Sequence, residues 1–386
     1  MDYDVAVIGA GIHGAGVAQA AAAAGYRVLV LEQYSLPALG TSSRSSKLIH
    51  GGLRYLESGQ FRLVWECLQE RARLLKNAPH LVRLAPFLIP VYRETQRRPW
   101  KIAVGLSIYS LFSRLPFSWV SRHRWKDLDG LRREGLQTVF SYYDAVTDDA
   151  RLTRAVLASA VSLGAELRLS ACFVGATLNA GGADLRFRTA EGHHRITSRV
   201  IVNTAGPWVN AVLSKITPSQ SLYPMELVQG THIQLPGRVS GIYYVEAPQD
   251  RRAVFVIPWR DTILVGTTET PYEGDPADVH PLAAEIDYLL GVYNYYFTCQ
   301  RSRQKIQDAF AGLRVLPAGE EGAFFRSRET VLKENCVSRP RLVTLYGGKL
   351  TAYRATATKV MKKIARSLPP RQPMADTRNL PLPLVD

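Results

Sequence analysis

The sequence predicts an α/β fold that combines two kinds of sheet. Near the N-terminus, an apolar run over 5–8 is followed by closely spaced glycines and then by alanines up to Ala24, which is the order strand, tight turn and helix. Between Glu226 and Glu269 the pattern changes to short β-rich runs, which favour antiparallel pairing. We therefore expect a parallel central sheet and a second, substrate-facing layer built on an antiparallel sheet.

The N-terminal segment carries an uninterrupted dinucleotide-binding fingerprint. Gly9, Gly11 and Gly14 directly follow the first strand, and a second strand over 27–31 ends in Glu32. In Rossmann-like domains such glycines let the backbone approach a pyrophosphate, and an acid about 20 residues further on binds a ribose hydroxyl. A purely structural glycine turn is the alternative, but the complete strand, helix, strand and acid favour a dinucleotide with a free 2′-hydroxyl.

Length and composition set the class of protein and its partners. The 386 residues, 46% of them hydrophobic, suffice for two joined domains with a sizeable core. Lys and Arg outnumber Asp and Glu by 48 to 33, and the net charge of +15 favours a phosphorylated substrate, an acidic membrane surface or nucleic acid. The four cysteines lack the spacing of a metal or redox site, so we expect reduced thiols and no metal.

The sequence gives no sign of a membrane-spanning or exported chain. It has no apolar stretch long enough to span a bilayer. The fingerprint begins at residue 2, which leaves no room for a signal peptide, so we expect a cytoplasmic protein.

The remaining elements are expected to alternate between two interleaved domains. Helices are expected over 151–163, 282–297 and the segment that ends at 364. Strands are expected over 166–169, 183–189, 195–199, 199–203, 231–235, 242–246, 253–258, 262–268 and 341–345. We assign 1–75, 140–210 and 336–370 to the nucleotide-binding domain, 76–139 and 211–335 to a substrate-binding and membrane-facing domain, and 371–386 to a C-terminal tail.

Two later turns are suited to close approach of a cofactor. The strand over 199–203 ends in the small residues of 204–206, and a helix follows. Gly347 and Gly348 open another helix, whose free N–H groups and positive dipole end attract negative charge. In a flavoenzyme, negative charge develops on the pyrimidine side of the reduced ring, where such a helix start is stabilising. A glycine turn without chemical purpose is the alternative.

The segment 40–57 combines several functions within a short length. Hydroxyl groups and backbone amides over 41–46 are suited to a diphosphate and a ribityl chain, and Gly51 and Gly52 permit approach to a flat ring. His50, Arg54 and Tyr55 add polar groups nearby. The alternative is a serine-rich loop beside a helix whose Arg and Tyr are surface residues.

In the order of these motifs, the chain resembles the FAD-dependent glycerol-3-phosphate dehydrogenases of the D-amino-acid-oxidase-like flavoprotein superfamily. The resemblance covers nearly the whole chain, and its most specific segments are 45–57, 265–269, 311–314, 326–329 and 347–354. It implies an FAD site formed by Gly9, Gly11, Gly14, Glu32, Gln33, Thr41, Ser42, Ser45, Ser46, Lys47, Leu48, Phe173, Ala205, Gly206, Trp208, Gly348, Leu350 and Thr351.

The chain departs from the family pattern in three places. Family members usually carry an Asp and an Arg in the first helix, where this chain has Ala20 and Ala24. Ala352 replaces the Gly, Ser, Thr or Glu that is common before the Tyr-Arg pair. Many members continue into a helical C-terminal domain, whereas this sequence stops at Asp386.

The resemblance also implies sn-glycerol 3-phosphate as the substrate and dihydroxyacetone phosphate as the product. The residues implied to hold it are Arg54, Tyr55, Arg314, Arg328 and Lys349. A phosphomonoester carries about two negative charges near neutral pH, for which arginine and lysine are the natural counter-charges.

Oxidation of the substrate's secondary alcohol requires a base and a hydride acceptor, and flavin N5 takes the hydride. His50 is our first candidate for the base, and His232 is its rival. Thr267 and Thr268 are candidates for binding a substrate hydroxyl, although ordinary β-strand threonines are the alternative.

A basic and aromatic stretch indicates where the protein acts. Between Arg93 and Lys126 there are eight Lys or Arg residues and one acid, interleaved with aromatic residues around a short apolar helix over 102–112. This pattern is typical of a helix in a membrane interface. We expect peripheral association with the inner face of the cell membrane and electron transfer to a membrane quinone. A core helix with solvated basic ends is the alternative, and no other feature resembles a nucleic-acid-binding motif.

Three other functions compete with this interpretation. A soluble NAD-dependent dehydrogenase is the weakest of them, because the Gly-Gly-Lys segment at 347–349 closes a flavin site better than a nicotinamide site. An amine or amino-acid oxidase of the same fold needs one arginine for a carboxylate rather than several cations. A non-catalytic flavin-binding membrane sensor needs neither a base nor a substrate cluster.

Overall fold

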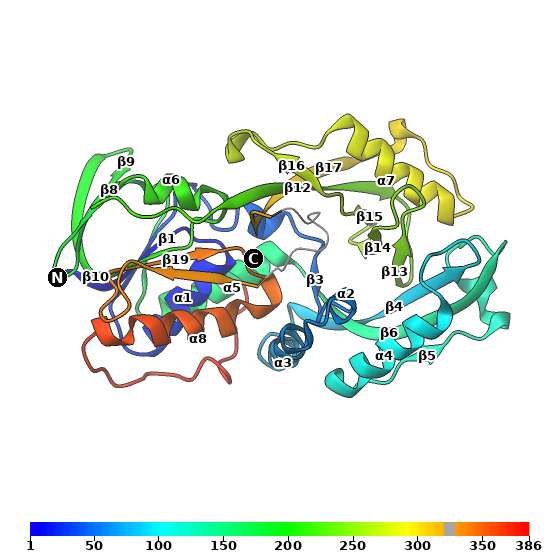
Figure 1. Ribbon diagram of the computed structural model, residues 1–386, viewed down its shortest axis with the longest axis horizontal. Coiled ribbons are helices and arrows are strands. Elements are labelled where there is room, and N and C mark those ends of the chain that lie inside the picture. Colours follow the sequence, from blue (N-terminus) through cyan, green and yellow to red (C-terminus); the bar gives the residue numbers. More distant parts are fainter. Residues whose placement is uncertain (320–328, 386) are drawn as a thin grey trace.

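The computed structural model describes residues 1–319 and 329–385, and these form two sheets that lie at opposite ends of an elongated molecule (Figure 1). The first sheet has nine strands and the second has ten within the described residues. The expected α/β fold, with a Rossmann-like parallel sheet and a largely antiparallel sheet, is confirmed.

The first sheet has a parallel centre extended by an antiparallel meander. Its main order is β11-β8-β9-β10-β1-β2-β7, with β19 beside the end of β10 and β18 beside β19. The pairs β7–β2, β2–β1, β1–β10 and β10–β19 are parallel. The strands are β1 (Tyr3–Ile8), β2 (Val28–Leu31), β7 (Glu166–Arg168), β8 (Cys172–Leu178), β9 (Ala183–Thr189), β10 (Gly192–Asn203), β11 (Ile216–Thr217), β18 (Val331–Glu334) and β19 (Leu342–Tyr346).

Helices α1 (Ile12–Ala23), α5 (Asp149–Ser162) and α8 (Tyr353–Ile364) pack together against this sheet. The alanines of α1 permit the close approach, since most of them are fully buried. Gly16 illustrates how little room there is, because a Cβ atom on it would lie 2.6 Å from the ring of Tyr353 in α8. The parallel strands, buried on both faces, are therefore held by small-residue helix contacts.

The second sheet runs in the order β16-β12-β15-β14-β13-β4-β6-β3, with β17 beside β12 and β5 beside β6. Its pairs are antiparallel except for β13 and β4, which are parallel. The strands are β3 (Leu48–Ile49), β4 (Val82–Tyr92), β5 (Ser118–Trp119), β6 (Leu136–Thr147), β12 (Met225–Pro236), β13 (Ile242–Glu246), β14 (Ala253–Trp259), β15 (Thr262–Gly266), β16 (Thr270–Tyr272) and β17 (Asp308–Pro317).

The other helices are α2 (Arg54–Glu57), α3 (Phe61–Asn77), α4 (Pro99–Ser113), α6 (Val209–Leu213) and α7 (Ala283–Tyr296). Short 3₁₀ turns η1 (Thr41–Ser43), η3 (Gly206–Trp208) and η6 (Leu350–Ala352) lie near the boundary between the sheets. No helix in the described ranges has both the length and the apolar character needed to cross a bilayer.

Several element boundaries differ from those expected. The two strands expected over 195–199 and 199–203 are one strand, β10, which pairs first with β9 and then with β19. The strand expected over 262–268 ends at Gly266. The helix expected after Gly347 and Gly348 begins only at Tyr353, because both glycines have positive φ and a 3₁₀ turn precedes the helix.

The sheets divide the chain at points that differ from the predicted domain boundaries. Strand β3 and residues 140–147 of β6 pair in the second sheet, although the prediction assigns them to the first domain. Strands β11 and β18 pair in the first sheet, although the prediction assigns them to the second domain. The division into functional domains stays a prediction.

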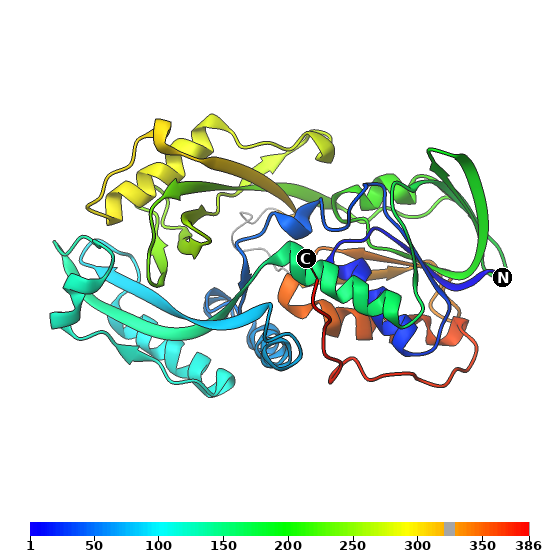
Figure 2. The ribbon, with the colours of Figure 1, turned by 180° about the vertical axis from the view of Figure 1, so that it is seen from behind.

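The C-terminal tail packs across the helical side of the first sheet. The backbone N of Met374 donates to Ala23, and that of Leu382 donates to Asn77. Figure 2 shows the tail returning from α8 to α5, where Arg151 Nη2 donates to the carbonyl of Val385. The tail therefore ties together the ends of α1, α3 and α5.

Candidate active site

A cavity of about 430 Å³ lies between the two sheets, at the carboxyl ends of the parallel strands. Four strand ends supply part of its lining: Gly9 follows β1, Glu32 follows β2, Ala205 follows β10 and Gly347 follows β19. This edge of an open parallel sheet is where α/β proteins bind nucleotides.

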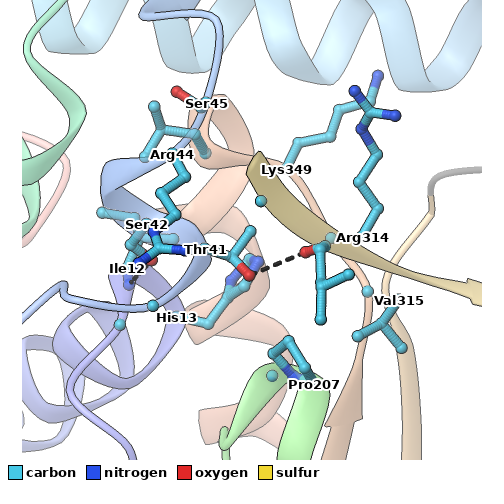
Figure 3. A pocket seen from close by; sticks show the side chains of 18 of the residues that line it. Ile12, His13, Thr41, Ser42, Arg44, Ser45, Pro207, Arg314, Val315 and Lys349 are labelled. Atoms are coloured by element: carbon cyan, nitrogen blue, oxygen red, sulfur yellow. Dashed lines mark hydrogen bonds between the residues drawn. The ribbon is translucent and has the colours of Figure 1, made fainter. Parts of the chain in front are cut away.

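The glycine turn after β1 leaves no room for side chains. Gly9 has φ +99°, and a Cβ atom on it would lie 2.9 Å from the carbonyl oxygen of Thr204. A Cβ atom on Gly14 would lie 1.8 Å from the carbonyl oxygen of Gly9. Gly9 and Gly11 line the cavity, whereas Gly14 lies behind them and lets α1 begin close to β1. Ile12 N donates to Ser42 Oγ at 2.9 Å, which fixes the turn to the serine-rich segment (Figure 3).

Glu32 is a buried carboxylate at the end of β2. Its Oε2 accepts from Ala10 N at 2.7 Å, and its Oε1 accepts from Tyr34 N at 3.0 Å. Burial raises the pKa of Glu32, and the backbone hydrogen bonds only partly offset that effect. Each carboxylate oxygen has two lone pairs, so this geometry is compatible with a further ribose hydroxyl.

The serine-rich segment is organised by Asp149, the first residue of α5. The carboxylate of Asp149 accepts from Ser45 N at 2.9 Å, from Ser45 Oγ at 2.6 Å and from Lys47 Nζ at 2.6 Å. Lys47 is buried and does not line the cavity, although it is among the predicted FAD residues. The ammonium of Lys47 therefore stabilises the loop through Asp149. Ser42, Ser45 and Ser46 do line the cavity.

Two contacts join this segment to the second sheet. Thr41 Oγ1 donates to the carbonyl of Leu313 in β17 at 2.8 Å, as Figure 3 shows. Arg44 Nη1 donates to the carbonyl of Ala311 in the same strand at 3.1 Å. Arg44 also lines the cavity, so it adds a positive charge that the sequence analysis did not single out.

The turn at 50–52 is supported from both sides. His50 N donates to Thr351 Oγ1 at 3.2 Å, and Gly51 N donates to the hydroxyl of Tyr109 at 2.8 Å. That hydroxyl in turn donates to Asp144, whose carboxylate pairs with Arg71. Helix α4 therefore contacts the turn through the buried side chain of Tyr109.

Three of the cations predicted to hold the substrate line the cavity, and we call Arg54, Arg314 and Lys349 the cation cluster. The ring of Tyr55 contacts two of them, with its centroid 5.1 Å from Arg54 Cζ and 3.5 Å from Lys349 Nζ. In Figure 3 the side chains of Arg314 and Lys349 extend toward the same end of the cavity. The predicted fourth cation, Arg328, lies outside the described residues.

Arg314 is held by the connection between β15 and β16. Its Nη2 donates to Thr267 Oγ1 at 2.8 Å, its Nη1 donates to the carbonyl of Thr268 at 3.1 Å, and Glu269 Oε1 lies 3.5 Å from Nη1. Thr267 lines the cavity. Thr268, the other predicted hydroxyl, is buried and donates to Glu285 instead, so its side chain points away from the cavity.

Both candidate bases line the cavity, but in different surroundings. His232 is buried, its ring stacks on Phe310, and its Nε2 lies 2.8 Å from Ser46 Oγ. Burial, reinforced by the charges of Arg314 and Lys47, lowers the pKa of His232 well below its usual value. The ring of His50 meets that of Phe255 edge-on, with centroids 6.3 Å apart.

The cavity contains further residues that sequence reasoning missed. His13 occupies a variable position of the glycine fingerprint, and burial lowers its pKa to about 4. Its Nδ1 is buried without a hydrogen-bond partner among the described residues. A Cβ atom on Gly348 would lie 2.3 Å from His13 Nε2. Other additional lining residues are Tyr34, Lys215, Tyr244 and Arg252.

The remaining predicted FAD residues line the same cavity. They are Gln33, Leu48, Phe173, Ala205, Gly206, Trp208, Gly348, Leu350 and Thr351. The glycine cradle, the buried acid and the unpartnered imidazole nitrogen together fit a large group with a diphosphate, a ribose and a flat ring. The particular contacts of each residue to FAD stay predictions.

The model of a family described as FAD-dependent oxidoreductases matches residues 4–354. The chain belongs to this family. FAD is therefore its cofactor, as the sequence predicts.

Known relatives are similar over most of the chain. A glycerol-3-phosphate dehydrogenase of Pseudomonas aeruginosa is 39% identical over 369 residues, which cover 94% of this chain and 71% of the relative. The aerobic glycerol-3-phosphate dehydrogenase of Escherichia coli is 37% identical, covering 94% and 73%. A D-erythritol 1-phosphate dehydrogenase of Brucella abortus is also 37% identical, covering 98% and 77%. The predicted resemblance to glycerol-3-phosphate dehydrogenases is confirmed.

Solved structures agree on the fold. The glycerol-3-phosphate dehydrogenase of Bacillus halodurans, complexed with FAD, matches with a TM-score of 0.75 at 27% identity over 95% of this chain. This chain spans 64% of that protein's length. An L-alpha-glycerophosphate oxidase of Mycoplasma pneumoniae with FAD bound matches over 99% of both chains, with a TM-score of 0.76 at 14% identity, which shows the fold alone.

Proposed function

We propose that this chain oxidises sn-glycerol 3-phosphate to dihydroxyacetone phosphate. Relatives named for this activity support the proposal. The observation that carries it is the cation cluster, because Arg54, Arg314 and Lys349 line one cavity with the glycine turn of the FAD-binding fold. FAD, when bound, supplies a hydride acceptor at flavin N5.

In this proposal the cation cluster binds the substrate phosphate, and Arg328 contributes a fourth cation. Two hydrogen bonds to the β15–β16 connection orient the guanidinium of Arg314. Tyr55 packs against Arg54 and Lys349 and orients them toward the same ligand. A site that binds a dianion in this way is expected to bind plain glycerol poorly, because glycerol has no negative charge to compensate for the desolvation of the cations.

His50 is the proposed base that accepts the proton of the substrate's secondary hydroxyl. The pKa of its rival His232 is lowered well below its usual value by burial, and its Nε2 lies within hydrogen-bond distance of Ser46 Oγ, so it is a weaker proton acceptor. His50→Ala is expected to slow flavin reduction at saturating substrate while the half-saturating concentration stays near that of the wild type. Stopped-flow absorbance measures both values, and an unchanged limiting rate would remove His50 from this role.

A related polyol phosphate is the second candidate substrate, because the Brucella abortus relative is named for D-erythritol 1-phosphate. Both substrates share the phosphate and a neighbouring secondary alcohol. The cation cluster is therefore suited to binding either substrate, and the two substrates differ in the length of the carbon chain.

The substrate class is tested by anaerobic reduction of the purified flavoprotein. Glycerol 3-phosphate, erythritol 1-phosphate, glycerol and glycine are added separately while the flavin absorbance near 450 nm, where oxidised flavins absorb, is followed. Bleaching by a polyol phosphate and not by glycerol or glycine is the expected result. Bleaching by glycine would support the amino-acid oxidase, and absence of bleaching by every compound would support a non-catalytic sensor.

We further propose that the protein associates peripherally with the inner face of the cell membrane. Large apolar side chains on and beside α4 support this, since Trp100 is 65% exposed, Leu111 is 76% exposed and Trp119 is 61% exposed. A helix buried in the core would not expose Trp100 and Leu111, and basic residues flank these positions in the sequence over 93–126.

A membrane quinone is the proposed electron acceptor. A second cavity of about 220 Å³ lies between α4 and the second sheet, and it is lined by apolar residues such as Phe61, Ile102 and Val104. Arg54 and Tyr244 line both cavities, so the two adjoin. In this proposal an apolar acceptor from the membrane approaches the flavin through the second cavity. Anaerobic addition of a short-chain quinone to the reduced protein is expected to restore the oxidised spectrum faster than air does.

A further inference from the structure

A buried carboxylate outside the main cavity organises one of its walls. Glu285 lies in the first turn of α7, and its two oxygens accept five hydrogen bonds. Those to Oε2 come from Gln229 Nε2 at 2.6 Å, Thr231 Oγ1 at 2.6 Å and Leu282 N at 3.2 Å, and those to Oε1 come from Thr268 Oγ1 and Thr270 Oγ1, both at 2.7 Å. Glu285 thereby joins α7 to β12 and to the connection between β15 and β16.

The hydrogen bonds keep Glu285 ionised although it is buried. Burial acts to raise the pKa of this carboxyl, but the donors, led by Thr231 and Thr268, outweigh that effect and leave the pKa below its usual value. An ionised carboxylate only accepts hydrogen bonds, so the threonine hydroxyls must all donate to it. Their orientations are therefore fixed.

The connection held by Glu285 is the one that holds Arg314. Thr268 donates its hydroxyl to Glu285 and offers its carbonyl to Arg314 Nη1. The preceding residue, Thr267, accepts from Arg314 Nη2. One short segment therefore contacts the buried carboxylate on one side and the guanidinium on the other.

Strand β12 links the two groups in the same way. Gln229 and Thr231 point their side chains to Glu285, while Gly230 between them faces the opposite side. A Cβ atom on Gly230 would lie 2.5 Å from Arg314 Nη2 and 2.6 Å from Thr267 Oγ1. The guanidinium of Arg314 therefore contacts one face of β12, and Glu285 is hydrogen-bonded to side chains on the opposite face of the same strand.

We propose that Glu285 is a positioning residue that sets the guanidinium of Arg314 for binding the substrate phosphate. It does not line the cavity and acts only through β12 and the β15–β16 connection. The inference rests on the proposed function, since that function assigns the phosphate to Arg314.

Glu285→Gln tests the proposal because it keeps the size of the side chain but replaces one acceptor oxygen with an NH₂ donor. The glycerol 3-phosphate concentration that half-bleaches the anaerobic holoenzyme is expected to rise about five-fold or more, at unchanged FAD content and limiting rate. In the Arg314→Ala background the same substitution is expected to change that concentration by less than about two-fold, because the residue it acts through is gone.

Glu70→Gln is the matched control. Glu70 is a buried carboxylate in α3 that pairs with Arg73 and Arg354 and does not line the cavity. Its loss is expected to lower thermal stability without raising the half-bleaching concentration. An equal rise in this control, or effects of Glu285→Gln and Arg314→Ala that multiply in the double variant, would overturn the positioning role.

A second measurement does not require turnover. Phenylglyoxal modifies arginine, and peptide mass spectrometry gives its rate at Arg314 in the holoenzyme. Glu285→Gln is expected to change that rate relative to the wild type and Glu70→Gln, and equal rates in all three would overturn the inference. If the wild type is not bleached by any polyol phosphate, the proposed function fails while this measurement still decides the positioning role.

A milder variant covers the case in which Glu285→Gln does not fold. Thr268→Val removes, at nearly constant volume, one of the five hydrogen bonds to Glu285 and also the hydroxyl oxygen that accepts from Thr231 N. A smaller rise in the half-bleaching concentration, again absent in the Arg314→Ala background, is expected. No rise in either background would overturn the proposal.

Discussion

Arg314→Ala tests the proposed phosphate site at a cation whose orientation the structure defines. The guanidinium lies in the wall of the cavity, oriented by Thr267 and Thr268. A charge-assisted hydrogen bond to a phosphate contributes about 1.5–3 kcal/mol, so its loss corresponds to about ten- to a hundred-fold weaker substrate binding. The backbone of the FAD cradle is not altered, so flavin content is expected to stay normal.

The assay is anaerobic titration with glycerol 3-phosphate, followed by flavin absorbance. Arg303→Ala is the control, because Arg303 is exposed and pairs with Asp287 away from the cavity. It removes the same unit of charge, so it reports the effect of net charge alone. Reduction of Arg314→Ala at wild-type substrate concentrations, or an equal shift in Arg303→Ala, would refute the assignment of phosphate binding to Arg314.

Three other predictions concern the cofactor, the membrane and pH. Glu32→Arg is expected to purify without FAD, since a cation replaces the acceptor for the ribose hydroxyl, whereas full flavin content would contradict that contact. Replacing Trp100, Leu111 and Trp119 together with Ser is expected to release the protein from anionic liposomes in flotation assays with FAD retained, and unchanged flotation would favour a different surface. The unfolded chain protonates His232 below about pH 6.5, while the folded protein keeps it neutral because its pKa is lowered. Folding stability is therefore expected to fall as pH is lowered from 7 to 5. His232→Gln should flatten that dependence in thermal melts, with the exposed His193→Gln as the control, and an unaltered slope would count against the lowered pKa.

Local sequence patterns predicted the nucleotide-binding half well for a physical reason. The strand over 5–8, the glycine turn and Glu32 follow one another within a single supersecondary unit, so short-range geometry determines them. The hairpin of β9 and β10 and the helix over 282–297 are also local, and the structure contains both. Their boundaries shift by a few residues because tertiary pairing sets where a strand ends.

Contacts between distant segments were beyond sequence reasoning. Lys47 and Asp149 are 102 residues apart, and no pattern near Lys47 shows that its ammonium pairs with the first residue of a helix. Thr267 and Thr268 are adjacent and chemically identical, and only the strand end decides which one faces the cavity. The aspartate that begins α5 is the one available signal, since an acid at a helix start commonly binds nearby N–H groups.

Helix α4 shows the same limit in another way. Its apolar sequence is compatible with either a core helix or a membrane-facing helix, and its composition does not separate the two. The structure buries Leu106 and Tyr109 and exposes Trp100 and Leu111, so one helix supports the turn at 50–52 and presents an apolar surface. Only the three-dimensional arrangement assigns each face.

The proposed oxidation of glycerol 3-phosphate by the chain's own FAD is tested most directly by product stoichiometry. The holoenzyme is mixed anaerobically with excess glycerol 3-phosphate, and dihydroxyacetone phosphate is quantified against the flavin bleached. One equivalent of product per equivalent of flavin reduced is the expected result, because each hydride transferred oxidises one alcohol. Bleaching without dihydroxyacetone phosphate, or no bleaching of a fully flavin-loaded protein, would contradict the claim.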